Sequence, residues 1–117
     1  MPRRADNTAV VFVTCANEEQ GAGIARVLVS ERLAACVNLI GSIRSIYRWR
    51  EKIEDDRETL ILIKTRTALL QKVEKRVRAL HTYEVPEIMA LRFHQGSAPY
   101  VDWLLDSTST RRKAAKR

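Results

Sequence analysis

Two extended runs joined by a very short connection constrain the fold of this 117-residue chain more than any other feature. Residues 35–49 alternate in polarity with a period of two, which places Tyr47 and Trp49 on the same face of a strand. Residues 52–65 form a second extended run almost immediately afterwards. The pair predicts a long antiparallel hairpin, with a bulge or bend at Gly41.

The outer half of this hairpin has little to bury within its own domain. Its second strand begins with the mostly acidic residues 54–58, and only the following segment, 59–65, is apolar enough for a core. The first strand is basic, so cross-strand attraction can favour pairing and leaves no basic stripe for nucleic acid. We therefore expect this arm, with Tyr47 and Trp49, to pack on another copy of the chain.

The order of the remaining elements points to a known fold class. The other expected elements are two strands, at 9–15 and 87–94, and three helices, one after the N-cap Asn17, one over 67–80 and one over 98–105. In the last helix, Trp103 and Leu104 are expected to face inward. The order β-α-β-β-α-β with a terminal helix predicts an α+β, ferredoxin-like fold with an extended hairpin.

The two most continuous apolar strands, 9–15 and 59–65, suit the centre of the sheet. Helices would cover one face of that sheet. The other face also needs a cover, and a single domain of this size offers none. Self-association is the economical answer.

Length and charge predict one domain with two tails. We expect a flexible N-terminal tail at 1–8, the folded domain at 9–108 and a basic, disordered tail at 109–117. Of the 21 Lys and Arg residues, seven lie in these tails, and the other 14 nearly balance the Asp and Glu residues of the body, so the body is close to neutral. No membrane-spanning run or signal peptide is evident, and two cysteines fit free thiols in the cytoplasm.

Catalytic and nucleic-acid-binding signatures are missing from the sequence. It has no nucleophile elbow, no phosphate-cradling glycine loop and no carboxylate pair with a clear geometric basis, which argues against an enzyme and against an organic cofactor. The segment 59–65 carries no aromatic residue for stacking bases, so we expect no specific nucleic-acid partner. We also expect no membrane partner.

Metal binding is a more open question. The candidate ligands are Cys15, Cys36, His81, Glu84, Glu87 and His94, and no pair has the short spacing of a dedicated site. Thiolate and imidazole suit copper better than magnesium or calcium. The alternative for both cysteines is burial as small hydrophobic residues, and for His81 it is a cap at the end of a helix.

Four segments carry a resemblance to a known family. LAACVN, SIYRWREKIEDDRETLILIKT, HTYEVPEI and YVDWLLDST, in this order from Val10 to Thr108, resemble the CutA family of divalent-cation tolerance proteins. The resemblance implies a homotrimer of ferredoxin-like protomers whose arms wrap their neighbours. It also implies copper binding by the histidine of an HxY motif, matched by His81, and by a cysteine near the end of the first strand, one position from Cys15.

The chain departs from the family pattern at two places. At the hairpin turn it has Trp49-Arg50-Glu51-Lys52 where the family usually has Trp-x-Gly-Lys. After His81, Thr82 stands where the family usually has proline.

A possible second site involves Lys64, which interrupts an apolar central strand and needs a carboxylate partner if buried. Residues that could converge on it across a subunit boundary are Trp49, Tyr83, Glu84 and Glu87. The cluster is either an ion-pair network that locks the trimer or a small-ligand cleft.

Three functions follow from these patterns. The first is a cytoplasmic homotrimer that binds copper or other divalent metal ions, with His81, Cys15 and Cys36 as ligands, and that responds to metal ions. The second is a trimeric signalling module that binds a small molecule at the subunit interface. The third is a passive scaffold.

Overall fold

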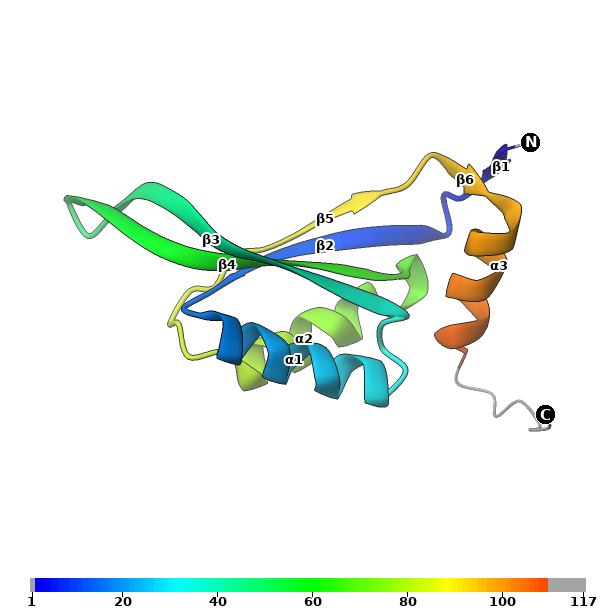
Figure 1. Ribbon diagram of the computed structural model, residues 1–117, viewed down its shortest axis with the longest axis horizontal. Helices are drawn as coiled ribbons and strands as arrows, with labels where there is room; N and C mark the ends of the chain where they lie inside the picture. Colours follow the sequence, from blue (N-terminus) through cyan, green and yellow to red (C-terminus); the bar gives the residue numbers. More distant parts are fainter. Residues whose placement is uncertain (1, 110–117) are drawn as a thin grey trace.

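The long hairpin dominates the computed structural model, which describes residues 2–109. Strand β3 (Cys36–Trp49) pairs antiparallel with β4 (Lys52–Arg66), and the outer end of the pair projects beyond the rest of the sheet (Figure 1). Gly41 and Ser42 lie where the register shifts by one extra residue on β3. The predicted hairpin and its bulge are therefore confirmed.

The hairpin turn uses an unusual pair of residues. Arg50 and Glu51 connect the strands with φ angles of 51° and 70°, so both adopt the left-handed conformation. A two-residue turn of this kind matches the twist of the strands and normally contains asparagine and glycine. This backbone conformation is unfavourable by roughly 1 kcal/mol for a residue with a Cβ atom.

Replacing Glu51 with glycine should therefore stabilise the protein by about 1 kcal/mol, because glycine adopts this conformation freely. Glu51 forms no ion pair within the described residues, so no contact is lost. The measurement is thermal unfolding at one fixed protein concentration. The control is Glu54→Gly in β4, which should lower stability by roughly 0.5–1 kcal/mol because glycine weakens a strand interior. Equal effects of the two changes would contradict this explanation.

The main sheet has the order β3-β4-β2-β5, with β2 at Thr8–Cys15 and β5 at Ile88–Arg92. All its neighbouring strands are antiparallel. Strands β2 and β4 are central, as predicted from their continuous apolar segments. The fold is the predicted α+β, ferredoxin-like arrangement.

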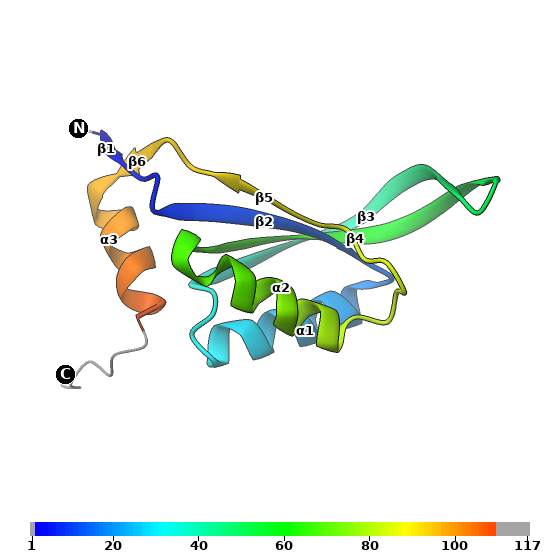
Figure 2. The same cartoon turned by 180° about the vertical axis from the view of Figure 1, so that it is seen from behind.

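Two helices cover one face of this sheet (Figures 1 and 2). Helix α1 (Glu18–Ser30) begins at the predicted N-cap, where Oδ1 of Asn17 accepts a hydrogen bond of 2.8 Å from the amide of Gln20. Helix α2 (Leu70–Leu80) follows a short 3₁₀ turn at Thr67–Leu69.

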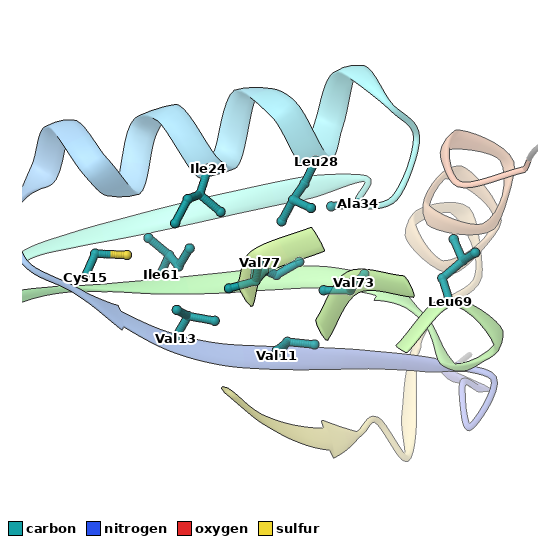
Figure 3. Packing of buried hydrophobic residues seen from close by; sticks show 11 residues of the cluster. Val11, Val13, Cys15, Ile24, Leu28, Ala34, Ile61, Leu69, Val73 and Val77 are labelled. Carbon is teal, nitrogen blue, oxygen red and sulfur yellow. The ribbon is translucent and has the colours of Figure 1, made fainter. Parts of the chain in front are cut away.

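The core lies between these helices and the sheet (Figure 3). It is built from alternate residues of the two central strands and the inner faces of both helices: Val11, Val13, Cys15, Ile61, Ile63, Ile24, Leu28, Val73 and Val77. Helix α1 approaches the sheet closely at Gly21, where an added Cβ would lie 3.1 Å from Cγ2 of Ile61. Glycine is therefore the residue that this contact accommodates without a shift of its neighbour.

The opposite face of the sheet is not covered by α1 or α2. Directly paired residues of antiparallel strands point to the same face. The register therefore places these residues together on what we call the open face: Cys36, Asn38, Ile40, Leu60, Leu62, Lys64, Val10, Phe12, Thr14, Met89 and Leu91. Met89 and Leu91 are 65% and 61% exposed, so much of this apolar surface is in contact with solvent in a single chain.

The N-terminal segment differs from the expected flexible tail. Residues Pro2–Arg4 form a short strand, β1, which pairs with β6 (Gln95–Ser97). Arg3 forms an ion pair with Asp102 of helix α3 (Ala98–Ser107). The prediction of a flexible 1–8 segment is thus wrong for this part, because backbone pairing and an ion pair hold it.

Helix α3 also differs from the prediction in one side chain. Val101 and Leu104 are buried, but Trp103 is 46% exposed, so the expectation that it faces inward is wrong for a single chain. The neighbouring positions 103 and 104 are about 100° apart around a helix, so only one of the two side chains points into the core. Of the predicted basic tail at 109–117, residues 110–117 lie outside the described residues. Within the described range, no helix combines the length and apolar character needed to cross a membrane.

Candidate functional site

His81 is the first residue after α2 and lies against the end of β2. Its Nε2 atom is 2.8 Å from the carbonyl oxygen of Thr14, and its Nδ1 atom accepts a hydrogen bond of 3.1 Å from the amide of Tyr83. A carbonyl oxygen only accepts, so Nε2 is the donor in the first of these bonds. The β2–β5 pairing ends at Val13, and the imidazole bonds the next carbonyl beyond it. A metal ion at either ring nitrogen would have to replace one of these bonds.

Cys15 is fully buried in the core. Burial, with a smaller contribution from the negative charge of Glu58, raises the pKa of this thiol to about 11. Thiolate is the form that binds metals and reacts with electrophiles. Cys15 therefore has the environment of a structural residue in a single chain.

The reactivity of Cys15 provides a direct test. In a Cys36→Ser variant, which leaves Cys15 as the remaining thiol, a thiol reagent at pH 8 should react with the protein only after unfolding. With a pKa of about 11, roughly one molecule in a thousand carries the thiolate at this pH. The reciprocal variant, Cys15→Ser, keeps Cys36 as its thiol. Labelling of this variant in denaturant is the control that shows the reagent to be active. Rapid labelling of the folded Cys36→Ser protein would show that Cys15 is accessible.

Cys36 has a different environment, because it is only partly buried and lies on the open face. Its sulfur is 3.9 Å from Oδ1 of Asn38. Burial, followed by the charge interaction and hydrogen bond with Cys36, raises the pKa of Tyr100 in α3. A sulfur, an amide oxygen and a phenol oxygen therefore gather at this point of the sheet.

The structure does not bring the three predicted metal ligands together. Cys15 pairs with Thr59 and Cys36 with Lys64, five positions further along β4, which is about 16 Å. Between residues 2 and 109, no three His, Cys, Asp or Glu side chains lie close enough together to hold a metal ion.

Two tyrosines and two carboxylates form a polar group beside the hairpin, here named the tyrosine–carboxylate cluster: Tyr47, Asp56, Glu58 and Tyr83. The Tyr83 hydroxyl donates to Oε2 of Glu58 at 2.8 Å, and the Tyr47 hydroxyl donates to Oδ2 of Asp56 at 2.5 Å. Glu58 is only 7% exposed. Glu58 lies just beyond the last residue of β4 that pairs with β2. At this point the Tyr83 hydroxyl supplies a hydrogen-bond donor for the Glu58 carboxylate.

The cluster holds both phenols in their protonated form. Burial and then the hydrogen bond to Glu58 raise the pKa of Tyr83 well above its usual value. The hydrogen bond to Asp56, and then burial, raise the pKa of Tyr47 to about 12. The role of Glu58 is hard to predict from sequence, because it lies in a run of charged residues that suggests exposure.

The predicted cleft residues divide into two groups. Glu84 forms an ion pair of 2.8 Å with Arg50, whose guanidinium lies 5.1 Å from the centre of the Trp49 ring, so the hairpin tip contacts the segment after α2. Glu87 is exposed just before β5. Lys64 lies on the open face, six positions along β4 from Glu58, or about 20 Å. In a single chain, Tyr83 and Glu84 therefore contact the arm that carries Tyr47 and Trp49. Lys64 lies apart from all four residues.

Charge on the arm is arranged by face as well as by strand. Arg44 lies opposite Arg57 and forms a two-pronged contact with Asp55, at 2.9 and 2.7 Å. Residues two apart on a strand share a face, so the register places most of the positive charges on one face and most of the negative charges on the other, with Asp55 and Lys52 as the exceptions. One face carries Arg44, Arg48 and Arg57, and the other carries Glu54, Asp56 and Glu58.

Comparison with known proteins gives consistent matches. The profile of the family described as CutA1 divalent ion tolerance protein matches residues 9–107. The Divalent-cation tolerance protein CutA of Thermus thermophilus is 48% identical over 85% of this chain and 96% of its own length. Mouse Protein CutA is 47% identical over 89% of this chain but 59% of its own length, and the Arabidopsis thaliana chloroplastic protein is 46% identical over 85% and 54%. The chain thus spans less than two thirds of these last two relatives.

Solved structures agree with the sequence matches. Cut A1 of Thermus thermophilus has a TM-score of 0.84 and 47% identity, covering 87% of this chain and 99% of that chain. CutA1 of Oryza sativa has a TM-score of 0.86 and 43% identity, covering 89% and 95%. Another match, at 31% identity and a TM-score of 0.85 over 87% of this chain and 99% of that one, is described as the periplasmic divalent cation tolerance protein of Archaeoglobus fulgidus. None of these names is that of an enzyme, and the compartments named differ.

Proposed function

Because the chain belongs to the CutA1 divalent ion tolerance protein family, we propose that it contributes to tolerance of divalent metal ions by binding them as a homotrimer. The observation that carries this proposal is the extent of the match. It covers residues 9–107 of this chain and 96% of a relative named for divalent-cation tolerance. A match over a whole domain supports a shared function better than an isolated motif does.

Exposed apolar residues support assembly of several copies. The open face has Ile40, Met89 and Leu91, and the arm has Ile46, Tyr47, Trp49 and Ile53, which are 37–67% exposed. So many large apolar side chains exposed on a single chain are typical of a protein that associates through these surfaces. The radius of gyration of 15.4 Å also exceeds the value of about 13 Å for a compact domain of this length, because the arm projects.

Copper is the metal that suits the proposed ligands best, since thiolate and imidazole are soft donors. Among His81, Cys15 and Cys36, Cys36 is the one that is neither buried in the core nor held by hydrogen bonds at both ring nitrogens. We assign it the leading role, with the oxygens of Asn38 and Tyr100 close by. Before binding a metal, His81 would have to lose a hydrogen bond, and Cys15 would have to leave the core. The open face would place this site where copies of the chain meet.

Calorimetric titration with copper, and with zinc as an ion that undergoes no redox reaction, tests the metal proposal. Cys36→Ser should weaken binding about tenfold or more, because it removes a thiolate ligand. His81→Ala and Cys15→Ser are the matched comparisons and should change the affinity less. If wild type binds neither ion, or if all three variants bind like wild type, the proposed site is wrong.

We further propose that the protein acts in the cytoplasm and has no enzymatic activity. Free thiols support a reducing compartment, since Cys15 and Cys36 are unpaired and too far apart along β4 to be joined in one chain. Cell fractionation with an antibody against the full chain tests the location. Recovery in another compartment would contradict it.

A further inference from the structure

A groove runs along the outer side of α2, between the helix and the segment 83–86 that follows it. Lys72, Lys75 and Arg78 line the helical side, and Tyr83 and Pro86 line the other side. The groove is therefore separate from the open face and from the surroundings of Cys36.

Positive charge in this groove is only partly balanced. Glu74 lies 3.8 Å from Arg78, and the carboxylate of Glu84 is held by Arg50 from the hairpin tip. Over residues 2–109, neither Lys72 nor Lys75 takes part in an ion pair. Two exposed ammonium groups are thus available for a ligand.

The spacing of the cations limits what such a ligand can be. Lys72, Lys75 and Arg78 are three residues apart along α2, so the first and last are separated by about 9 Å along the helix axis. Residues with this spacing are neighbours on a helix surface. A single small anion would reach only one or two of them, whereas an extended chain of anionic groups would reach all three.

We propose that this groove binds a linear polyphosphate group, of the kind that inorganic tripolyphosphate and a nucleoside triphosphate both present. Lysine and arginine are suited to phosphate oxygens as charged hydrogen-bond donors. For a nucleotide, the Tyr83 ring and Pro86 offer an apolar surface beside the phosphates.

The position of the groove keeps it accessible in an assembly and connects it to the arm. Helix α2 lies on the face of the sheet opposite to the open face (Figure 2), so self-association through the open face would leave the helical side of the groove, with its two lysines, in solvent, whereas the other side lies at the arm. Two of its lining residues contact the hairpin directly, Tyr83 through Glu58 and Glu84 through Arg50. A ligand that orders the 83–86 segment would therefore act on residues that hold the arm.

The test is calorimetric titration of the full chain, free of divalent ions and at an ionic strength of about 0.15 M, with tripolyphosphate and separately with ATP. The groove variant is Lys72→Gln/Lys75→Gln. The matched control, Arg26→Gln/Arg32→Gln, removes the same charge from exposed positions outside the groove, the open face and the arm that lack ion pairs in the described structure. Every variant retains the basic residues 111–117, so any binding by them is the same throughout.

The groove variant should raise the Kd for tripolyphosphate about tenfold or more, because two charged donors are lost. The control should change it less than about threefold, since distant exposed charges are screened. Equal affinities for ATP and tripolyphosphate would identify the phosphate chain as the whole ligand, and tighter binding of ATP would add a contact to the base. Failure of wild type to bind either probe, or equal weakening in both variants, would overturn the proposal.

Discussion

Replacing Met89 and Leu91 with glutamate should separate the copies of the chain. Both side chains project from β5 onto the open face and are more than 60% exposed in a single chain. Burying an apolar side chain of this size contributes about 1.5–3 kcal/mol, and burying an unpaired carboxylate costs several kcal/mol. In an assembly that uses this face, each copy would contribute two such carboxylates.

The measurement for this variant is sedimentation at micromolar concentration. Val29→Glu is the control, because Val29 is 44% exposed on α1, which covers the other face of the sheet. The control should keep the mass of the wild-type particle. A Met89→Glu/Leu91→Glu protein with that same mass would show that the open face is not the interface.

Replacing Leu28 with alanine should lower the free energy of unfolding by about 2–5 kcal/mol. Leu28 is fully buried between α1 and the sheet, and its loss leaves a cavity among the side chains shown in Figure 3. For a domain of this size, a change of this magnitude should lower the Tm by about 10 °C or more.

The adjacent residue offers a matched control for this effect. Val29→Ala alters an exposed side chain one position along the same helix and should change stability by about 0.5 kcal/mol or less. Both variants are compared by thermal unfolding at one protein concentration, because the stability of an assembly depends on concentration. Similar losses for the two variants would contradict the core described above.

Strong periodicity explains why so much of the fold can be predicted from the sequence. The hairpin, its bulge at Gly41 and the central positions of β2 and β4 all follow from alternation or from continuous apolar runs. Strand β1 could not be predicted in this way, because Pro2–Arg4 is short and polar and is held by partners almost a hundred residues away. The prediction that Trp103 faces inward failed for a related reason. Trp103 and Leu104 are both apolar, and only the packing of the helix decides which of the two is buried.

The candidate site was less predictable than the fold, because it depends on contacts between distant segments. One of the two hydrogen bonds of the His81 ring requires the carbonyl of Thr14, 67 residues away. The separation of Cys15 from Cys36 depends on the register of β4 with two different strands. The same register places most of the positive and most of the negative charges of the arm on opposite faces, which the composition of each strand does not reveal.

The account depends most on one claim, that the projecting arm and the open face are buried against other copies of the chain. The most direct measurement is the mass of the wild-type protein by sedimentation equilibrium at micromolar concentration. The account predicts a particle of three chains, about three times the 13.4 kDa of one chain. A well-folded particle of 13.4 kDa at that concentration would contradict it.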